Sequence, residues 1–449
     1  MNFYYLNLEI LNDELSNYSN TKEYSNIIFK NLSFKDRVKS FLKPEFKFIN
    51  TKDINFQVEE EIVIWTSNIV FIDDVKIKLF VDKLYHSQGS FMWGSKEGFI
   101  YKGTKNDFEA ENYKIFTLEP FLIEIFDFQS YRNLLEISLD TREFNEIEKA
   151  QDIYIKKSQN LEKIEMEYKF LSSVPESLKN FFISVHSFKQ SGTMAQYSMP
   201  RINYLDISKR HVNGELSQKD IASLFQQLTI YFEKLIEHKF IMSDEPFDFI
   251  SEKTKNRIIT FESLDIYQLV DNVFNFSSNY KSIDVAFTEL NFFLEKNRKA
   301  IHKKGSVISH GDLCFSNILA SQNFQDLILI DPMGGLFDDS VQSIYYDFAK
   351  LSHSIMGGYD LIINGLAELK FDENMEIFIS FKKENNMYLE EAFLDLLDKF
   401  GLNVSITRLV EASLFLSMLP LHTENHMKTA MLALRGSEIL AQLVKSKTI

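Results

Sequence analysis

The sequence predicts an α+β protein in which a separate β-rich amino-terminal domain precedes a small β-rich region and a large helical region. Three observations predict it. Alternating and β-branched apolar runs, which favour strands, recur before residue 158. Apolar residues at helical spacing dominate from residue 217 onward. We expect domains at 1–125, 126–205 and 206–449, although no low-complexity linker marks the boundaries between them.

The amino-terminal region, residues 1–125, is expected to be built mainly of strands. Residues 61–65 (EIVIW) and 75–81 (VKIKLFV) combine alternation with β-branched residues. That pattern is typical of a strand with one buried face. No motif in this region indicates a function.

Residues 131–175 predict strand, turn, strand, strand and then a helix. The last strand, 153–157 (IYIKK), ends in two lysines. The helix after it ends near Pro175, and its apolar residues recur at helical spacing: Leu161, Ile164, Tyr168 and Leu171.

The rest of the chain is predicted to be largely helical. An amphipathic helix at 217–240 opens the large region, with one apolar stripe made of Ile221, Leu224, Leu228, Phe232 and Leu235. A second helix is expected around 284–298 and a third from about 341 to Gly357. From 361 to 447 the pattern is helical, with interruptions at Gly401 and Pro420.

Composition narrows the class of protein. The chain has 49 Lys and Arg against 64 Asp and Glu, a net charge of −15, and no block of basic residues. Nucleic-acid binding needs Lys and Arg to neutralise phosphates, so we do not expect it; a cationic substrate is compatible with this charge. A single cysteine excludes an intrachain disulfide. With no signal peptide and no membrane-spanning run, we expect a cytoplasmic protein that does not bind membranes.

Residues 307–335, VISHGDLCFSNILASQNFQDLILIDPMGG, hold the polar residues that indicate chemistry. Asn317 lies five residues after Asp312, and Asp331 lies nineteen after it, at the end of a second apolar run. Strands on either side of a turn at 321–323 would bring these three side chains to one end of a hairpin. Phosphoryl transfer uses such a set: one carboxylate for the attacking hydroxyl, and an amide oxygen and a carboxylate for Mg²⁺ on the nucleotide phosphates.

HGDLCFSNIL followed by LIDP resembles the catalytic loop and metal-binding segment of the aminoglycoside phosphotransferase and choline kinase family. In that family His-Gly-Asp replaces the His-Arg-Asp of protein kinases. The resemblance implies a bilobal protein-kinase-like fold with ATP and Mg²⁺ as cofactors, Asp312 as the catalytic base, and Asn317 and Asp331 as metal ligands. It implies structural roles for His310 and for Asp347, which would brace the catalytic loop from the following helix.

The resemblance also implies a lysine that contacts the α- and β-phosphates from the small lobe. Alternate residues of a strand share a face, so only one of Lys156 and Lys157 can enter the cleft. We choose Lys156, because Ile153 and Ile155 then both point to the core of the lobe. Lys157 remains the alternative.

Other nucleotide contacts follow from position in the resemblance. Glu167 matches the glutamate that orients the lysine, with Glu165 as second choice. The Gly-rich phosphate loop is missing, and Arg142, in the corresponding turn, is a candidate phosphate contact or a surface residue. The backbone from Tyr197 to Met199 is expected at the adenine.

The acceptor is expected on the helical carboxy-terminal part, as in the family. His422 is a candidate contact there, and His353 is a second; packing in the core is the alternative for both. His422 and His426 would share one helical face, as in a zinc site. There is no HExxH motif and no third ligand, so zinc is not expected.

Three functions compete. The first is a kinase of a sugar, amino alcohol or aminoglycoside-like acceptor; by analogy with relatives that carry an added amino-terminal domain, it would act in surface polysaccharide biosynthesis. A protein kinase is less favoured, because only about ten residues separate Asp331 from the next helix, too few for an activation segment. A catalytically weak or dead nucleotide-binding or interaction module is the third. It would be indicated by loss of a base or metal ligand, and none is lost.

Overall fold

The computed structural model describes residues 1–8, 11, 16, 21–29, 32–52, 61–127, 130, 131, 134, 146–150, 153–238, 245–335, 340–382, 386–423 and 425–447. The chain divides into two compact units. The amino-terminal unit is Met1–Asp140 with Asn213–Glu215, and the second unit is Thr141–Val212 with Leu216–Ile449. The domain boundaries expected from the sequence, at 125 and 205, remain predictions.

The amino-terminal unit contains a six-stranded mixed sheet in the order β4-β1-β5-β8-β7-β9. β1 is parallel to both of its neighbours, whereas β8 is antiparallel to β5 and β7. The strands are β1 (Asn2–Leu6), β4 (Lys47–Thr51), β5 (Glu61–Thr66), β7 (Phe91–Gly94), β8 (Phe99–Thr104) and β9 (Lys114–Phe116). Shorter elements of this unit are η1 (Tyr24–Asn26), β2 (Ile28–Phe29), β3 (Leu32–Ser33), β6 (Ile69–Phe71) and β10 (Leu122–Glu124).

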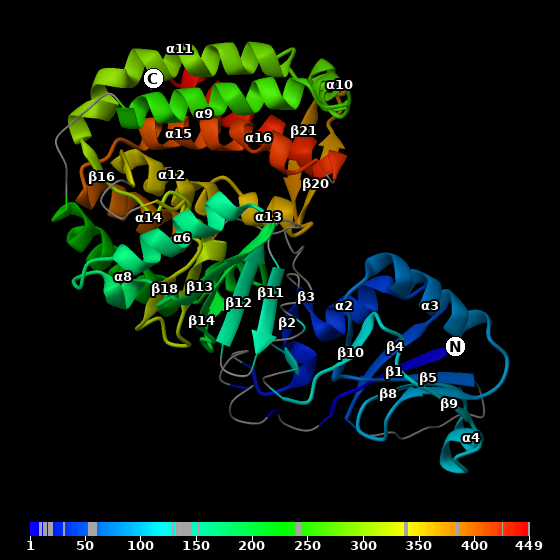
Figure 1. Ribbon diagram of the computed structural model, residues 1–449. Helices are drawn as coiled ribbons and strands as arrows, with labels where there is room; N and C mark the ends of the chain where they lie inside the picture. Colours follow the sequence, from blue (N-terminus) through cyan, green and yellow to red (C-terminus); the bar gives the residue numbers. More distant parts are fainter. Residues whose placement is uncertain are drawn as a thin grey trace. The chain divides into compact units, whose positions relative to one another are not determined.

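Helices α2 (Phe34–Phe41) and α3 (Asp74–His86) cover one face of this sheet (Figure 1). Alternate residues of each strand point to that face or to the other, where α4 (Lys105–Glu109) packs. On β5, for example, Val63 and Trp65 join the core under α2 and α3, while Ile62 and Ile64 join the cluster on the α4 side.

The prediction of a strand at 75–81 is wrong, because these residues belong to helix α3. The side chain of Asp73 caps the helix by accepting hydrogen bonds from the first backbone N–H groups, at 3.0 and 2.9 Å. Val75 and Leu79, which completed the alternating pattern, are 71% and 66% exposed. The buried residues follow helical spacing instead: Ile77, Phe80, Val81 and Leu84.

The second unit begins with a four-stranded antiparallel sheet in the order β11-β12-β14-β13. The strands are β11 (Glu146–Ala150), β12 (Ile153–Ser158), β13 (His186–Ser191) and β14 (Met194–Pro200). Helix α6 (Leu161–Ser173), capped by Asn160, follows β12 as predicted, and η2 (Lys179–Phe181) follows α6. Residues 135–145, which include the first predicted strand and the turn after it, lie outside the described residues.

The remainder of this unit is mainly helical, as the sequence predicts. In Figure 1, α9, α11, α15 and α16 lie together at the end of the unit away from the four-stranded sheet. The helices are α7 (Ile207–Val212), α8 (Gln218–Ile236), α9 (Glu245–Glu262), α10 (Tyr267–Asp271), η3 (Asn272–Phe276), α11 (Ile283–Lys304), η4 (Phe315–Asn317), α12 (Ile344–Ile355), α13 (Tyr359–Ile363), α14 (Met387–Lys399), α15 (Val404–Ser417), η6 (Leu419–Leu421) and α16 (His426–Lys445).

Short strands flank the loops within residues 307–335. β17 (Ile318–Ala320) pairs antiparallel with β18 (Leu327–Leu329), and β15 (Leu205–Asp206) pairs with the other edge of β17. β16 (Ser306–Ile308) pairs antiparallel with β19 (Val341–Ser343). The hairpin predicted on either side of 321–323 is therefore confirmed.

The sequence missed a second hairpin, made of β20 (Ala367–Phe371) and β21 (Ile377–Phe381), inside the stretch predicted to be helical. Asp372 closes its turn by accepting hydrogen bonds from the backbone N–H groups of Asn374 and Glu376, both at 2.8 Å. The period of two in AELKF and IFISF was the sequence signal that could have predicted these two strands.

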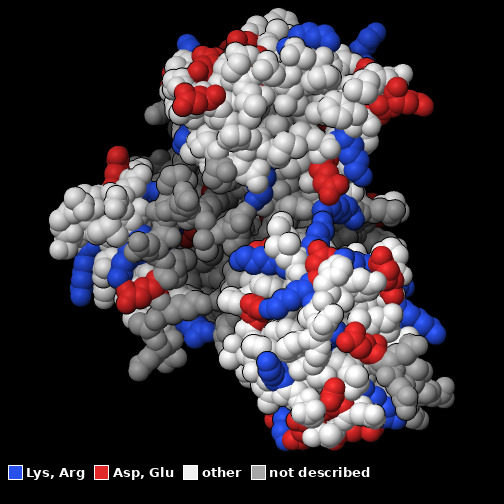
Figure 2. Space-filling view, turned by 90° about the vertical axis from the view of Figure 1, so that its right-hand side faces the viewer, with Lys and Arg blue, Asp and Glu red and all other residues white. Residues whose placement is uncertain are grey.

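One continuous hydrophobic core runs from the four-stranded sheet to the carboxy-terminal helices. It therefore fixes the sheet and the helices of the second unit against each other. No helix in the described part of the chain is long and apolar enough to cross a bilayer. On the face drawn in Figure 2, acidic and basic side chains are interspersed, so the net charge of −15 is not gathered into one acidic field there.

Candidate active site

Lys156, on β12, lies between two carboxylates. Its Nζ is 2.7 Å from Oε2 of Glu167 on α6 and 2.9 Å from Oδ1 of Asp331, which follows β18. The Lys156 side chain is 1% exposed, whereas that of Asp331 is 36% exposed. The carboxylate of Asp331 is therefore reachable from solvent although its lysine partner is buried.

Lys157, the alternative, points the other way and pairs with Glu148 on β11. Lys156 was chosen because Ile153 was expected to point to the core of the lobe. Ile153 is instead 38% exposed and does not enter the core. Lys156 is on the same face as Tyr154 instead, and Tyr154 packs against the core of the unit.

Glu167 rather than Glu165 meets the lysine. It is buried on α6 and also accepts a hydrogen bond from the Tyr197 hydroxyl on β14, at 3.2 Å. Glu165 is on the surface of α6 and pairs with Lys169 at 2.7 Å. The sequence had assigned Tyr197 only a backbone role.

The three charged groups influence one another's ionisation. Burial by itself would lower the pKa of Lys156, but Asp331 and Glu167 outweigh it and raise that pKa above its ordinary value. Burial would raise the pKa of Asp331, but Lys156 outweighs it, so the pKa of Asp331 is lowered. Burial raises the pKa of Glu167, and Lys156 only partly offsets this.

Tight backbone contacts place Asp331 beside α6. Asp331 adopts a left-handed conformation with φ of 57°, which Asp tolerates better than most residues. Gly334 has φ of 103°, and a Cβ there would lie 2.8 Å from Cβ of Met166, so only glycine fits against the helix. The backbone N–H of Gly335 then donates to the carbonyl of Met166 at 2.9 Å.

Asp312 lies in the loop between β16 and η4. Asn317 donates from Nδ2 to the backbone carbonyl of Asp312 at 2.8 Å and to its Oδ2 at 3.0 Å. The backbone N–H of Ile330, next to Asp331, donates to the carbonyl of Asn317 at 3.0 Å. These contacts bring Asp312, Asn317 and Asp331 to one end of the β17–β18 hairpin, as the sequence predicted.

Lys350 was not predicted from the sequence. Its Nζ, from α12, is 2.8 Å from Oδ1 of Asp312, with side-chain exposures of 10% and 28%. Burial would lower the pKa of Lys350, but Asp312 outweighs it and raises that pKa above its ordinary value. Lys350 is the single cation within the otherwise apolar run FAKL, three residues after Asp347, and this pattern could have marked it as a candidate site residue.

His310 and Asp347 hold the loop together from inside. Asp347 accepts hydrogen bonds from the backbone N–H groups of His310 and Gly311, both at 2.9 Å. The His310 ring lies between the Asp312 N–H, 3.2 Å from Nδ1, and the Ile330 carbonyl, 3.0 Å from Nε2. These partners fit a neutral ring protonated on Nε2, and burial lowers the pKa of His310.

The remaining oxygens suit a hard cation. Asp331 uses Oδ1 for Lys156, and Asn317 uses its amide nitrogen for Asp312, which leaves Oδ2 of Asp331 and Oδ1 of Asn317 as donors. Among the described residues, no three His, Cys, Asp or Glu side chains are grouped so that they could hold a metal. Two side-chain oxygens fit Mg²⁺, which is commonly held by few carboxylates together with substrate phosphates.

Other predicted site residues lie apart from this cluster or outside the described chain. Met199 is inside β14, paired with Tyr154, and the segment between β14 and β15 is 201–204. Its contact with adenine remains a prediction. Arg142 lies outside the described residues.

The two candidate acceptor histidines are buried near each other, at the edge of the carboxy-terminal helices. His353, on α12, stacks on Tyr359 with ring centroids 4.1 Å apart. The ring of His422 is edge-on to Tyr359, with centroids 6.2 Å apart. The expectation that His422 and His426 share a helical face is wrong. α16 begins at His426, capped by Asn425, whereas His422 is the C-cap residue that follows η6.

No protein-family description and no curated protein matches the sequence. Among solved structures, the chain is similar to an apo thermostable mutant of aminoglycoside phosphotransferase APH(4)-Ia, at 11% identity and a TM-score of 0.43, over 68% of this chain and 93% of that one. The likeness is one of fold alone. A ternary complex of a mutant of that enzyme with AMP-PNP and hygromycin B aligns at 9% identity and a TM-score of 0.41, over 69% and 98%. A mutant aminoglycoside 2′-phosphotransferase-IIIa with GDP aligns at 14% and 0.43, over 69% and 92%.

Proposed function

We propose that this chain is an ATP- and Mg²⁺-dependent kinase that transfers the γ-phosphoryl group to a hydroxyl of a small molecule. One observation carries the proposal. Lys156 is held between Glu167 and Asp331, while the hairpin that carries Asp331 also brings Asn317 against Asp312. With these roles, a cation for the phosphates, oxygens for a metal ion and a carboxylate base would share one site, which is what phosphoryl transfer requires.

On the nucleotide side, we assign Lys156 to the α- and β-phosphates, with Glu167 as the residue that orients it. Asp331 and Asn317 would hold Mg²⁺, which when bound neutralises charge on the phosphates. Arg142 is expected to contact the phosphates and the backbone near Met199 the adenine.

On the acceptor side, Asp312 is assigned to orient the hydroxyl and take its proton. The hydroxyl oxygen forms a bond to the γ-phosphorus as the bond from that phosphorus to the β–γ bridging oxygen breaks, and ADP leaves. Lys350, 2.8 Å from Asp312, would add positive charge near the transferred phosphoryl group. Catalysis would then come from positioning and electrostatics more than from strong basicity.

The test is ATP consumption with Mg²⁺ and a panel of sugars, amino alcohols and aminoglycosides, with Asp312→Asn beside the wild type. We expect at least one acceptor to stimulate ADP release, and the variant to lose about 10²–10⁴-fold in kcat while still binding nucleotide. Equal turnover in the variant would remove Asp312 as the base. Nucleotide binding without stimulation by any acceptor would favour the inactive nucleotide-binding module.

A further inference from the structure

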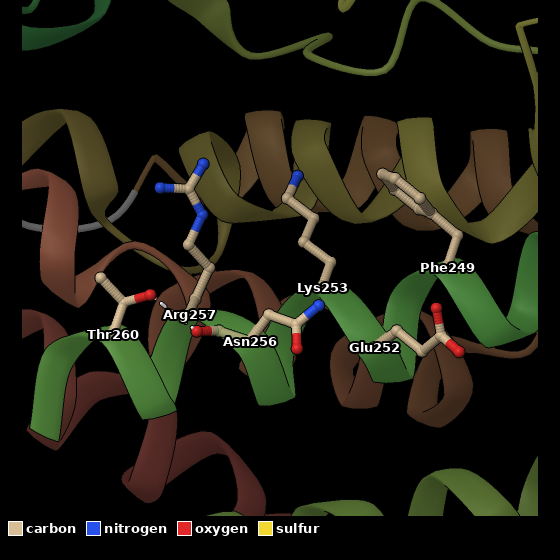
Figure 3. Close-up of a pocket in the computed structure, with 6 residues that line it drawn as sticks. All are labelled: Phe249, Glu252, Lys253, Asn256, Arg257 and Thr260. Carbon is tan, nitrogen blue, oxygen red and sulfur yellow. Dashed lines mark hydrogen bonds between the residues drawn. The ribbon is translucent and has the colours of Figure 1, made fainter.

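A concavity of about 390 Å³ lies over helix α9 in the second unit. Its lining residues all come from that helix: Phe249, Glu252, Lys253, Asn256, Arg257 and Thr260. Figure 3 shows Lys253 and Arg257 pointing the same way from the helix as the ring of Phe249, while the carboxylate of Glu252 lies apart from them. The concavity thus has an apolar edge and a cationic centre.

Lys253 and Arg257 are half-buried, and Glu252 is exposed. Arg257 forms no ion pair or hydrogen bond with any residue that the structure describes, so its guanidinium group is available to a ligand. Lys253 donates to the Tyr346 hydroxyl and lies 5.2 Å from the centroid of that ring. Asn256 and Thr260 add neutral groups that can bond to hydroxyls.

Helix α12 carries residues that contact both this cationic centre and the proposed base. Tyr346 and Lys350 are four residues apart on α12, which places them on one face of the helix, about 6 Å apart along its axis. Lys350 in turn pairs with Asp312 at 2.8 Å. Lys253 thus contacts Tyr346 on α12, and Lys350, on the same face of α12, contacts Asp312.

The signs of the charges decide which acceptors fit. Helices α9 and α12 contribute three cations here, Lys253, Arg257 and Lys350, against the carboxylates of Glu252 and Asp312. An ammonium-bearing acceptor would meet like charges, whereas a phosphate or carboxylate would bond to the guanidinium and ammonium groups. We propose that the acceptor is a hydroxylated molecule carrying a phosphate or a carboxylate, held by Lys253 and Arg257 with its hydroxyl toward Asp312. This inference rests on the proposed kinase function and narrows its substrate class.

Acceptor preference is tested by ADP release from the full-length protein with ATP and Mg²⁺. Four acceptors share a ring and differ in charge: glucose, glucosamine, glucose 6-phosphate and glucuronate. We expect one or both anionic acceptors to exceed the other two by about tenfold or more in kcat/KM, and the phosphate and carboxylate arms identify which anion is used. Equal or better use of glucose or glucosamine overturns the inference and leaves the kinase function standing.

Variants locate the anion site. Lys253→Met and Arg257→Gln are each expected to raise KM for the anionic acceptor about tenfold. Lys255→Gln is the matched control, because Lys255 is exposed on the same helix two residues from each and faces another side. Wild-type KM in both variants, or an equal rise in the control, overturns the inference.

If none of the four acceptors is phosphorylated, a binding measurement tests whether Lys253 and Arg257 form an anion site. Inorganic phosphate is titrated calorimetrically into the wild type and a Lys253→Met/Arg257→Gln double variant, both loaded with Mg²⁺ and AMP-PNP. Saturable binding that is at least about tenfold weaker in the double variant supports the inference, and absent or equal binding overturns it. Failure of Mg²⁺ and AMP-PNP themselves to bind would overturn the proposed function instead, so the two failures are distinguishable.

Discussion

Two lysine–aspartate pairs lie in the candidate active site, and they differ in how tightly each lysine is held. Lys156 is 2.9 Å from Asp331 and has a second carboxylate, Glu167, at 2.7 Å. Lys350 is 2.8 Å from Asp312, and the other oxygen of that carboxylate is taken by Asn317. The first lysine is thus fixed from two sides, and the second is held by a single carboxylate.

The difference indicates different tasks. A lysine between two carboxylates keeps one position, which suits a clamp on phosphates that are bound before and after the reaction. A lysine with one carboxylate partner can share its ammonium group with negative charge that develops on the transferred group. We therefore expect loss of Lys156 to affect nucleotide binding and stability, and loss of Lys350 to affect mainly kcat.

The largest effect is expected for Lys156→Met. It leaves Glu167 and Asp331 without their shared cation, and breaking a buried ion pair in this way destabilises a protein by about 3–5 kcal/mol. We also expect ATP turnover to fall by at least about 10³-fold, since two carboxylates then repel the phosphates. Urea unfolding and steady-state kinetics are the measurements. Lys157→Met, on the same strand, is the matched control, and a comparable loss there would contradict the assignment.

Lys350→Met is expected to lower kcat by about 10²–10³-fold, the usual effect of removing one group that stabilises transition-state charge. The KM for ATP should change little, because Lys350 pairs with Asp312, whereas the phosphate-binding Lys156 pairs with Glu167 and Asp331. Lys350→Arg keeps the charge and should recover part of the loss. A rise in KM for ATP at constant kcat would instead assign Lys350 to nucleotide binding.

Glu167→Gln should have a smaller effect, about tenfold on kcat/KM, because Asp331 still holds the ammonium group of Lys156 and only its second partner is neutralised. Glu165→Gln on the surface of the same helix should behave as the wild type. Comparing the two variants in ATP kinetics tests whether the second carboxylate is what fixes Lys156. Equal values for both would show that Asp331 alone suffices.

The smallest effect concerns pH. Because the pKa of His310 is lowered in the folded protein, its contribution to stability is present above its ordinary pKa of about 6.5 and is lost as pH falls from that value toward the lowered one. We expect a loss on the order of 1 kcal/mol per unit of pKa difference. Urea unfolding at pH 7.5 and 5.5 measures it, and His310→Gln should show a smaller pH dependence than the wild type. An unchanged dependence would exclude His310 as its source.

Local pattern was sufficient for some elements and misleading for others. The hairpin at 318–329 was predicted because two apolar runs flank a polar turn. The stretch 75–81 was misjudged because seven residues fit both a period of two and a helical period, and the cap from Asp73 outside the stretch decides between them. The hairpin at 367–381 was missed because flanking helical patterns outweighed its alternation.

Charge is a second property for which the sequence and the local structure differ. The net charge of −15 was compatible with a cationic substrate, yet the concavity over α9 is lined by Lys253 and Arg257. A net charge sums over the whole surface, whereas an acceptor interacts with the few groups within a Debye length of about 10 Å. Which groups those are depends on how the helices pack.

The sequence by itself determined the set of Asp312, Asn317 and Asp331, because a short hairpin and its two flanking loops bring them together by local geometry alone. It also limited the phosphate-binding lysine to Lys156 or Lys157, because two adjacent residues of a strand point to opposite faces and only one of them can enter the cleft. Only the tertiary structure decided that Lys350 meets Asp312 and that Lys253 reaches Tyr346. Those contacts join elements far apart in the chain, and the hydrophobic core that packs them is specified by many residues together and by no single motif.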